Sequence, residues 1–184
     1  MILLKFFLKF LFIISMLMSE EVKFYNQDNE SFADVTTKNN LTFTCRVSGL
    51  ENTGETVILL HGFPSTSHMW HELIDFLSNE NYRVIAPNQR GYSQGARPSE
   101  ISEYHIDNLV QDVLDIADAM DADKFHLIGH DWGSAVGWAV TATNKDRILT
   151  WTALSVPHLD AFGDAIVNDE TQENKSSYID FFRM

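Results

Sequence analysis

The turn Gly129-His130-Asp131-Trp132-Gly133 carries the side chain best placed for chemistry in this sequence. It follows the apolar run Phe125–Ile128 and precedes a stretch rich in small residues, which is the strand-turn-helix setting of a nucleophile elbow. Such a turn projects its central side chain above the sheet, so the pattern predicts that Asp131 is a nucleophile whose carboxylate can form an ester with carbon. The alternative is that Asp131 only caps the helix beginning near Trp132, because aspartate is a favoured N-cap residue.

A second turn, His61-Gly62-Phe63-Pro64, follows the apolar run Thr56–Leu60. The backbone N–H groups of Phe63 and Trp132 could together form an oxyanion hole, with one donor from each loop. In an aspartate enzyme these donors would hold the oxyanion that forms when water attacks the ester carbonyl. A rigid or cis Phe63–Pro64 bond would fix the peptide plane that carries the first donor. An ordinary strand-to-helix turn is the alternative.

Three histidines and one proline are expected to line the substrate site. His61 and His130 flank the two loops, and we expect them to orient backbone rather than to carry protons. Pro64 would border the substrate from the first loop. Of the seven histidines only His158 follows Asp131. Because His158 lies just past a strand end, it could face the site without taking part in proton transfer. A role for His158 as the base is the minor alternative.

Charge and cysteine content exclude several other functions. The chain has 26 acidic and 13 basic residues and a formal net charge of -13, so its surface should repel phosphates and no nucleic-acid partner is expected. The single cysteine, Cys45, cannot form an internal disulfide and is expected to pack within a strand. No cluster of histidine, cysteine and carboxylate residues has metal-ligand spacing, so we expect no metal or cofactor. The oligomeric state is not predicted.

Alternating strand and helix patterns would position these turns. Apolar residues of His105–Asp121 recur at helical spacing, and Asp107, Asp112, Asp115 and Asp118 are expected largely on the other side of that helix. Two strands are expected before any helix. We therefore predict an α/β fold with a mainly parallel sheet and with the turns at the carboxyl ends of its strands. The expected strands are Leu41–Val47, Thr56–Leu60, Tyr82–Ala86, Phe125–Ile128 and Ile148–Leu154.

The first eighteen residues are almost entirely apolar and resemble a targeting segment. The uninterrupted run Phe10–Met18 has the length of a signal-peptide core and is shorter than the roughly 20 residues that a membrane-spanning helix needs. A signal would make the protein secreted, or membrane-associated through residues 1–18 alone. The alternative is that Met18 is the true start, which would give a cytoplasmic protein.

Three motifs taken in order resemble the epoxide hydrolase branch of the α/β-hydrolase superfamily. They are His61-Gly62-Phe63-Pro64, Ala86-Pro87-Asn88-Gln89-Arg90-Gly91-Tyr92-Ser93 and Gly129-His130-Asp131-Trp132-Gly133. The resemblance covers Leu41 to the end of the chain. It implies that Asp131 opens a small apolar epoxide, that a downstream histidine oriented by an acid activates water, and that lid tyrosines hydrogen-bond the epoxide oxygen.

One lid tyrosine lies within the sequence. The segment Tyr178-Ile179-Asp180-Phe181-Phe182-Arg183 resembles the first lid-tyrosine segment of the family, and this resemblance makes Tyr178 the donor to the epoxide oxygen. Three positions depart from the family pattern. Arg183 stands where glutamine usually follows the aromatic pair, Asn88 stands in place of aspartate, and Ser134 stands where a second glycine often follows the elbow. None of these departures removes a catalytic group.

The resemblance also implies a division of the chain. We expect a signal-like segment over residues 1–18, an N-terminal extension over 19–40, the N-terminal part of an α/β-hydrolase core over 41–155, and the start of the lid over 156–184. The catalytic acid and histidine would then lie beyond Met184. On this expectation the fold is truncated at the start of the lid, and the 184-residue chain by itself is inactive.

Two other functions stay open. An aspartate that displaces halide would use the same elbow, and the indole N–H of Trp132 could bind the leaving halide. Haloalkane dehalogenases usually carry asparagine where Phe63 stands, which favours the epoxide. The other possibility is a truncated, non-catalytic fragment whose last strand has an exposed edge. The reading frame after Met184 would decide between a fragment of an active enzyme and a remnant.

Overall fold

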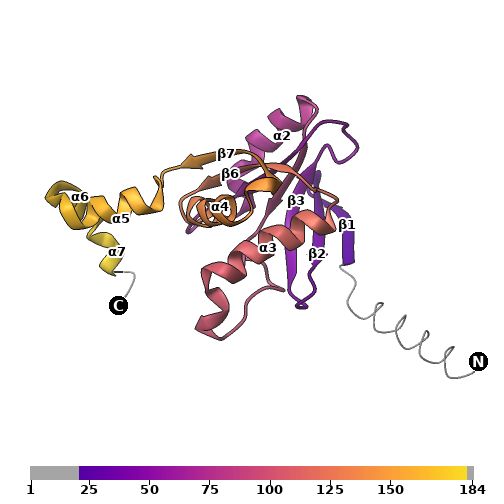
Figure 1. The fold of residues 1–184 in the computed structure, drawn as a ribbon. Helices are drawn as coiled ribbons and strands as arrows, with labels where there is room; N and C mark the ends of the chain where they lie inside the picture. The colour runs from indigo at the N-terminus through magenta and orange to yellow at the C-terminus, as the bar shows by residue number, and fades with distance from the viewer. Residues whose placement is uncertain (1–20, 182–184) are drawn as a thin grey trace, which may run out of the picture.

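The computed structural model describes residues 21–181, and Figure 1 shows their fold. Within these residues seven strands form one sheet, in the order β1-β2-β3-β5-β4-β6-β7. The predicted α/β fold is confirmed. The strands are β1 Glu21–Gln27, β2 Glu30–Thr36, β3 Thr42–Ser48, β4 Thr56–Leu60, β5 Arg83–Pro87, β6 Phe125–His130 and β7 Ile148–Leu154.

The sheet has a parallel half and an antiparallel half. Strands β5, β4, β6 and β7 run parallel, whereas β1, β2 and β3 form an antiparallel meander that joins the parallel half through β3 and β5. All three motifs follow parallel strands, so they lie at one edge of the sheet, where the carboxyl ends of these strands meet. The parallel strands predicted from the sequence form the half of the sheet that carries the motifs.

Helices cover both faces of the sheet, with α2 on one side and α3 and α4 on the other (Figure 1). Along β4, Ile58 and Leu60 belong to the core cluster shared with α3 and α4, whereas Val57 and Leu59 belong to the cluster shared with α2. A strand covered on both faces has no solvent side, which is why β4 is a continuous buried run. The bounds are α2 His71–Asn79, α3 Ile106–Ala119 and α4 Trp132–Thr143, with short 3₁₀ turns η1 Ser67–Trp70, η2 Ile101–Tyr104 and η3 Lys145–Arg147.

The predicted helix over His105–Asp121 is α3, but the expected solvent side was wrong for two of its acids. Asp112 and Asp115 are buried. The guanidinium of Arg90 donates to both carboxylate oxygens of Asp112, at 2.8 Å from Nε and 2.7 Å from Nη2. The side chain of Arg90 is itself buried, and a buried charge needs a paired partner. Long-range pairing therefore overrides the helical pattern here.

The stretch described in the sequence analysis as an N-terminal extension, residues 19–40, contains two strands of the sheet. Strands β1 and β2 form a hairpin, so four strands rather than two precede the first helix of the described residues. The hairpin turns at Asp28 and Asn29, whose φ angles of 52° and 66° are those of a two-residue type I′ turn. Strand β1 is mostly exposed, and its polar and apolar residues alternate only over Glu21–Phe24, which is why periodicity did not reveal the strand.

The last described helices form an arm that leaves the end of β7 and extends away from the sheet (Figure 1). The arm comprises α5 Leu159–Asn168, α6 Glu170–Ser176 and α7 Tyr178–Phe181. No residue of α5 is buried.

Two predictions fall on residues outside the described range. The signal-like segment 1–18, with its alternative start at Met18, is one, and the positions Phe182 and Arg183 of the lid-tyrosine segment are the other. Among residues 21–181, no helix is long and apolar enough to cross a membrane.

Candidate active site

Asp131 occupies a tight turn between the end of β6 and the start of α4. Its φ of 54° and ψ of -121° lie in a region that non-glycine residues rarely adopt. The backbone N–H groups of Ser134 and Ala135 donate to the Asp131 carbonyl at 2.8 and 3.1 Å, which closes the first turn of the helix. The carboxylate makes no capping hydrogen bond to that helix. The side chain is therefore directed elsewhere, and the alternative of a simple N-cap does not hold.

The two motif loops meet at the Asp131 carboxylate. The backbone N–H of Phe63 donates to Oδ1 of Asp131 at 2.8 Å, although the two residues are far apart in the sequence. Two glycines permit this approach. A Cβ atom at Gly62 would overlap the Cβ of Asp131, and one at Gly133 would overlap the carbonyl of Leu60. The convergence expected from the order of the motifs is thus present, and only residues without a side chain fit at the crossing.

The groups predicted to form an oxyanion hole lie on either side of this crossing. The peptide bond between Phe63 and Pro64 is cis. The Trp132 N–H, at the start of α4, has no hydrogen bond to any residue of the described range. The side chains of Phe63 and Trp132 are exposed. Trp132 follows Asp131 in the sequence, and the Phe63 backbone approaches Asp131 from the other loop. Function as an oxyanion hole stays a prediction.

His61 is fully buried and holds the first loop in place. Its Nε2 accepts a hydrogen bond from the backbone N–H of Gln89 at 3.1 Å, and its Nδ1 lies 3.1 Å from the carbonyl of Gly62. The Gln89 side-chain amide also donates to the His61 carbonyl. Because Nε2 must be an acceptor, the proton resides on Nδ1 and the ring is neutral. Burial lowers the pKa of His61, which agrees with a neutral ring that orients backbone.

His158 and His130, two further predicted site residues, make no hydrogen bond with the Asp131 carboxylate. The ring of His158 packs edge-on against Trp138 with ring centroids 4.9 Å apart, and its Nδ1 accepts from the backbone N–H of Asp160 at 3.3 Å, which caps α5. His130 precedes the nucleophile, and its buried Nδ1 has no hydrogen-bond partner among the described residues. Contact of either histidine with substrate stays a prediction.

Tyr178 is not brought to the nucleophile. It begins α7, at the far end of the arm, and Figure 1 shows α7 well separated from α4. Its side chain is 61% exposed. Donation by Tyr178 to a substrate oxygen stays a prediction, and it requires the arm to lie over the elbow.

Two residues beside the site carried no assigned role in the sequence. Gln89 anchors His61, and the ring of Tyr92 packs edge-on against the His61 ring with centroids 4.5 Å apart. Burial, and after it the negative charge of Asp131, raise the pKa of Tyr92. Both residues lie in the loop after β5, which neighbours β4 in the sheet. The order of the strands, rather than the motif itself, is the signal that places them at the site.

Comparison with known proteins identifies the fold family. A sequence profile described as the alpha/beta hydrolase fold matches residues 55–178, which is more than half of the chain. The chain belongs to this family. The match includes the His61 loop, the elbow and the start of the arm.

Individual relatives place the hydrolase in the epoxide hydrolase-like branch. AB hydrolase superfamily protein YfhM of Bacillus subtilis is 36% identical over 146 residues, an alignment that covers 79% of this chain and 51% of that protein. Epoxide hydrolase A of Mycobacterium tuberculosis is 41% identical over 103 residues, covering 56% of this chain and 32% of that protein. The hydrolase therefore spans about half or less of the length of these curated relatives.

Solved structures agree with this placement. One solved structure is of a novel epoxide hydrolase from metagenomes of hot environments. It has 29% sequence identity to this chain and a TM-score of 0.75, and the match covers 91% of this chain and 52% of that chain. The epoxide hydrolase of Bacillus megaterium in complex with an inhibitor has 26% identity and a TM-score of 0.74, covering 88% and 52% of the two chains.

Asn88 shows how the hydrolase accommodates one departure from its family. The Oδ1 atom of Asn88 accepts a hydrogen bond from the backbone N–H of Ser67 at 2.8 Å, and the Asn88 carbonyl accepts from Oγ of Ser93 at 2.6 Å. The neutral amide oxygen thus supplies an acceptor of the kind that a carboxylate would. The loop that carries Gln89 and Tyr92 remains anchored without the charge.

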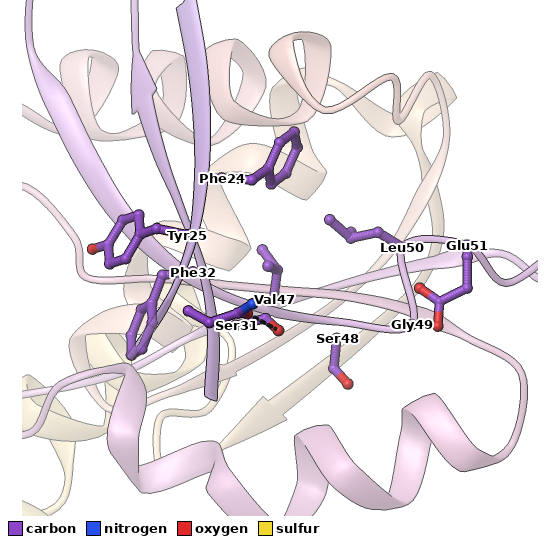
Figure 2. A pocket seen from close by; sticks show the side chains of 10 residues that line it. Phe24, Tyr25, Ser31, Phe32, Val47, Ser48, Gly49, Leu50 and Glu51 are labelled. Carbon is purple, nitrogen blue, oxygen red and sulfur yellow. Dashed lines mark hydrogen bonds between the residues drawn. The ribbon is translucent and has the colours of Figure 1, made fainter. Parts of the chain in front are cut away.

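Two surface pockets of the hydrolase lie away from the nucleophile. One of about 250 Å³ is lined by residues of β1, β2, β3 and the loop after β3, and the side chains of Phe24 and Leu50 point toward each other there (Figure 2). Strand β1 is the outer strand at the opposite side of the sheet from β7. A second hollow of about 380 Å³ lies within the arm, beside α6 and α7. Neither is lined by Asp131, so neither is the predicted substrate site.

Proposed function

We propose that the protein containing this chain hydrolyses epoxides through an ester on Asp131. One observation carries the proposal: the Asp131 carboxylate projects from a strained elbow and receives the Phe63 N–H on one oxygen, in a chain whose relatives include epoxide hydrolases. The epoxide and water are the only reactants, and no cofactor takes part. Because the chain spans about half or less of those relatives, the complete activity is proposed for the whole protein.

We infer different tasks for the two oxygens of Asp131 from their hydrogen bonds. Oδ1 is held by the Phe63 N–H, and Oδ2 accepts no hydrogen bond from any residue within 21–181. In the proposed first step, Oδ2 attacks an epoxide carbon, the carbon–oxygen bond of the ring breaks, and the released oxygen takes a proton from Tyr178. The product is an ester in which Oδ1 has become the carbonyl oxygen.

The second step returns the carboxylate. Water attacks the ester carbonyl, and the charge that develops on Oδ1 is held by the N–H already bound to it, together with that of Trp132. The bond between the carbonyl carbon and Oδ2 then breaks, and the diol leaves with the original epoxide oxygen and Oδ2, while the water oxygen is kept on Asp131. Of the two protons of the water, one passes through the base to the departing oxygen and the other returns to Tyr178. The base that takes the proton from water is assigned, from the family resemblance, to a histidine outside the described residues.

The test is removal of the nucleophile in the natural gene product. Asp131→Ala should abolish diol release from an aryl epoxide while the protein still unfolds cooperatively, because the lost group attacks substrate and is not a major packing element. Asp107→Ala, which removes an exposed carboxylate from α3, is the matched control and should leave turnover unchanged. Normal turnover by Asp131→Ala would remove the assignment. Asp131→Asn is a poorer test because deamidation could restore the carboxylate.

The same assay distinguishes the dehalogenase alternative. Incubation with a haloalkane should release no halide, because Phe63 stands where such enzymes usually carry asparagine. Halide release in the absence of diol formation would replace the epoxide proposal with dehalogenation by the same aspartate.

A further inference from the structure

The hydroxyl of Ser134 lies beneath the nucleophile and contacts the ends of two strands. Ser134 is completely buried in the first turn of α4. Its Oγ lies 2.6 Å from the carbonyl of Gly129 near the end of β6, 2.8 Å from the carbonyl of Leu154 at the end of β7, and 3.1 Å from the Leu154 backbone nitrogen. Within residues 21–181, no other side chain is hydrogen-bonded to both strand ends.

A single hydroxyl can serve as donor and acceptor in this geometry. It carries one proton, which it donates to the Gly129 or the Leu154 carbonyl, and it accepts the N–H of Leu154 on a lone pair. The Leu154 carbonyl also accepts the backbone N–H of Asp131 at 3.1 Å. Leu154 is therefore bonded to the elbow twice, once through the nucleophile's own backbone and once through Ser134. The family resemblance often places glycine at this position, and glycine could not make the second bond.

We propose that Ser134 is a positioning residue, whose hydroxyl fixes the Asp131 backbone to the last residue of β7. The catalytic consequence rests on the function proposed above. Immediately after Leu154, Ser155 has a φ of 71°, and from there the chain proceeds into the arm that carries Tyr178. The hydroxyl thus joins the element that holds the nucleophile to the strand from which the arm departs.

The test uses Ser134→Ala in the natural gene product, with two independent measurements. Native-state hydrogen exchange of the Leu154 amide should become about tenfold faster, because the amide loses the acceptor that protects it. The kcat for an aryl epoxide should fall about tenfold with little change in KM, because a displaced nucleophile weakens the transition state more than substrate binding. Ser134→Gly also removes the hydroxyl without adding an atom, and it serves if the alanine variant does not fold.

Thr37→Val is the matched control. It removes another buried hydroxyl, which donates to the Leu41 carbonyl at 3.1 Å in the β2–β3 turn, far from the elbow in the sheet order. This control should lower stability without changing kcat. A merely structural role for Ser134 would make both variants alike, and wild-type kcat and Leu154 exchange in Ser134→Ala would overturn the proposal. If the wild-type protein released no diol, the proposed function would fail, and hydrogen exchange at Leu154 would still decide whether Ser134 fixes the elbow.

Discussion

The elbow and the arm of this hydrolase are held in place in very different ways. At the elbow, buried or side-chain-free residues fix the backbone from three sides: Gly62 admits the neighbouring loop, His61 is bonded to the β5 loop, and Ser134 is bonded to β7. In the arm, α5 buries no residue, and Val167 is 79% exposed. The group assigned to attack is therefore preorganised by the sheet, whereas the group assigned to donate a proton is not.

That contrast predicts that the elbow can begin a reaction that it cannot finish. A polypeptide of residues 1–184, made by itself and incubated with a reactive aryl epoxide, should gain the mass of one substrate and release no diol. Attack needs the carboxylate and a proton for the released oxygen, and Asp131 and Tyr178 are both within residues 1–184. Hydrolysis also needs an activated water, and the nitrogens of His61 are already bonded within the loops. Diol release and protein mass are measured together.

Sustained diol formation above one equivalent would contradict this expectation. Repeating the incubation with His158→Ala would then show whether His158, despite its capping bond to Asp160, acts as the base.

Replacing a glycine by alanine should lower turnover at the elbow but not in the arm. Gly62→Ala places a Cβ against that of Asp131, so the loops must separate, and turnover by the natural gene product should fall roughly a hundredfold. Gly163→Ala in α5 meets no atom within 4 Å and should leave turnover unchanged while stabilising the helix by up to about 1 kcal/mol. Steady-state kinetics and thermal unfolding measure both. Equal loss of activity in the two variants would mean that the arm is as constrained as the elbow.

Removing the hydroxyl of Tyr178 should have a smaller effect. Tyr178→Phe is expected to lower kcat about tenfold in the natural gene product, because one hydrogen bond to the departing oxygen is lost while the aromatic ring remains. Tyr104→Phe is the control. The Tyr104 hydroxyl lies outside the arm and donates to the Pro98 carbonyl at a distance of 3.0 Å. Unchanged kcat in Tyr178→Phe would assign the donor to another residue, and the arm would then need no closure to support this step.

The pH dependence of stability should be the smallest effect and should come from the elbow. Burial lowers the pKa of His61 from 6.5, so the unfolded state binds its proton first as the pH falls. The stabilisation from a neutral His61 is complete above about pH 6.5 and is lost as the pH falls toward the lowered value, by at most about 1.4 kcal/mol per pH unit.

His61→Gln should flatten this dependence, because an amide oxygen can accept the Gln89 N–H without titrating. Thermal unfolding of both proteins between pH 5 and 7, chosen to span the ordinary histidine pKa, is the measurement. Parallel curves for the two proteins would show that His61 does not contribute to the pH dependence.

Local sequence patterns determined the elements that carry the site. The buried run Thr56–Leu60 and the strand Ile148–Leu154 have the predicted bounds, and α3 lies within the predicted helix. The turn around Asp131 was also predictable, because a strand, a tight turn and a stretch of small residues are adjacent in the chain. These features depend on neighbours within a few residues, which is the range over which periodicity and turn propensity act.

Only the tertiary structure decided which atoms of the converging loops bond to one another. The order of β5, β4 and β6 places Gln89 beside His61 and Phe63 beside Asp131. Burial of Asp112 and the bonds of Ser134 to the end of β7 likewise depend on partners distant in sequence. Periodicity reports which face of an element is apolar, but it does not report which other element covers that face. Strand order supplies this information, and it results from the packing of the whole sheet.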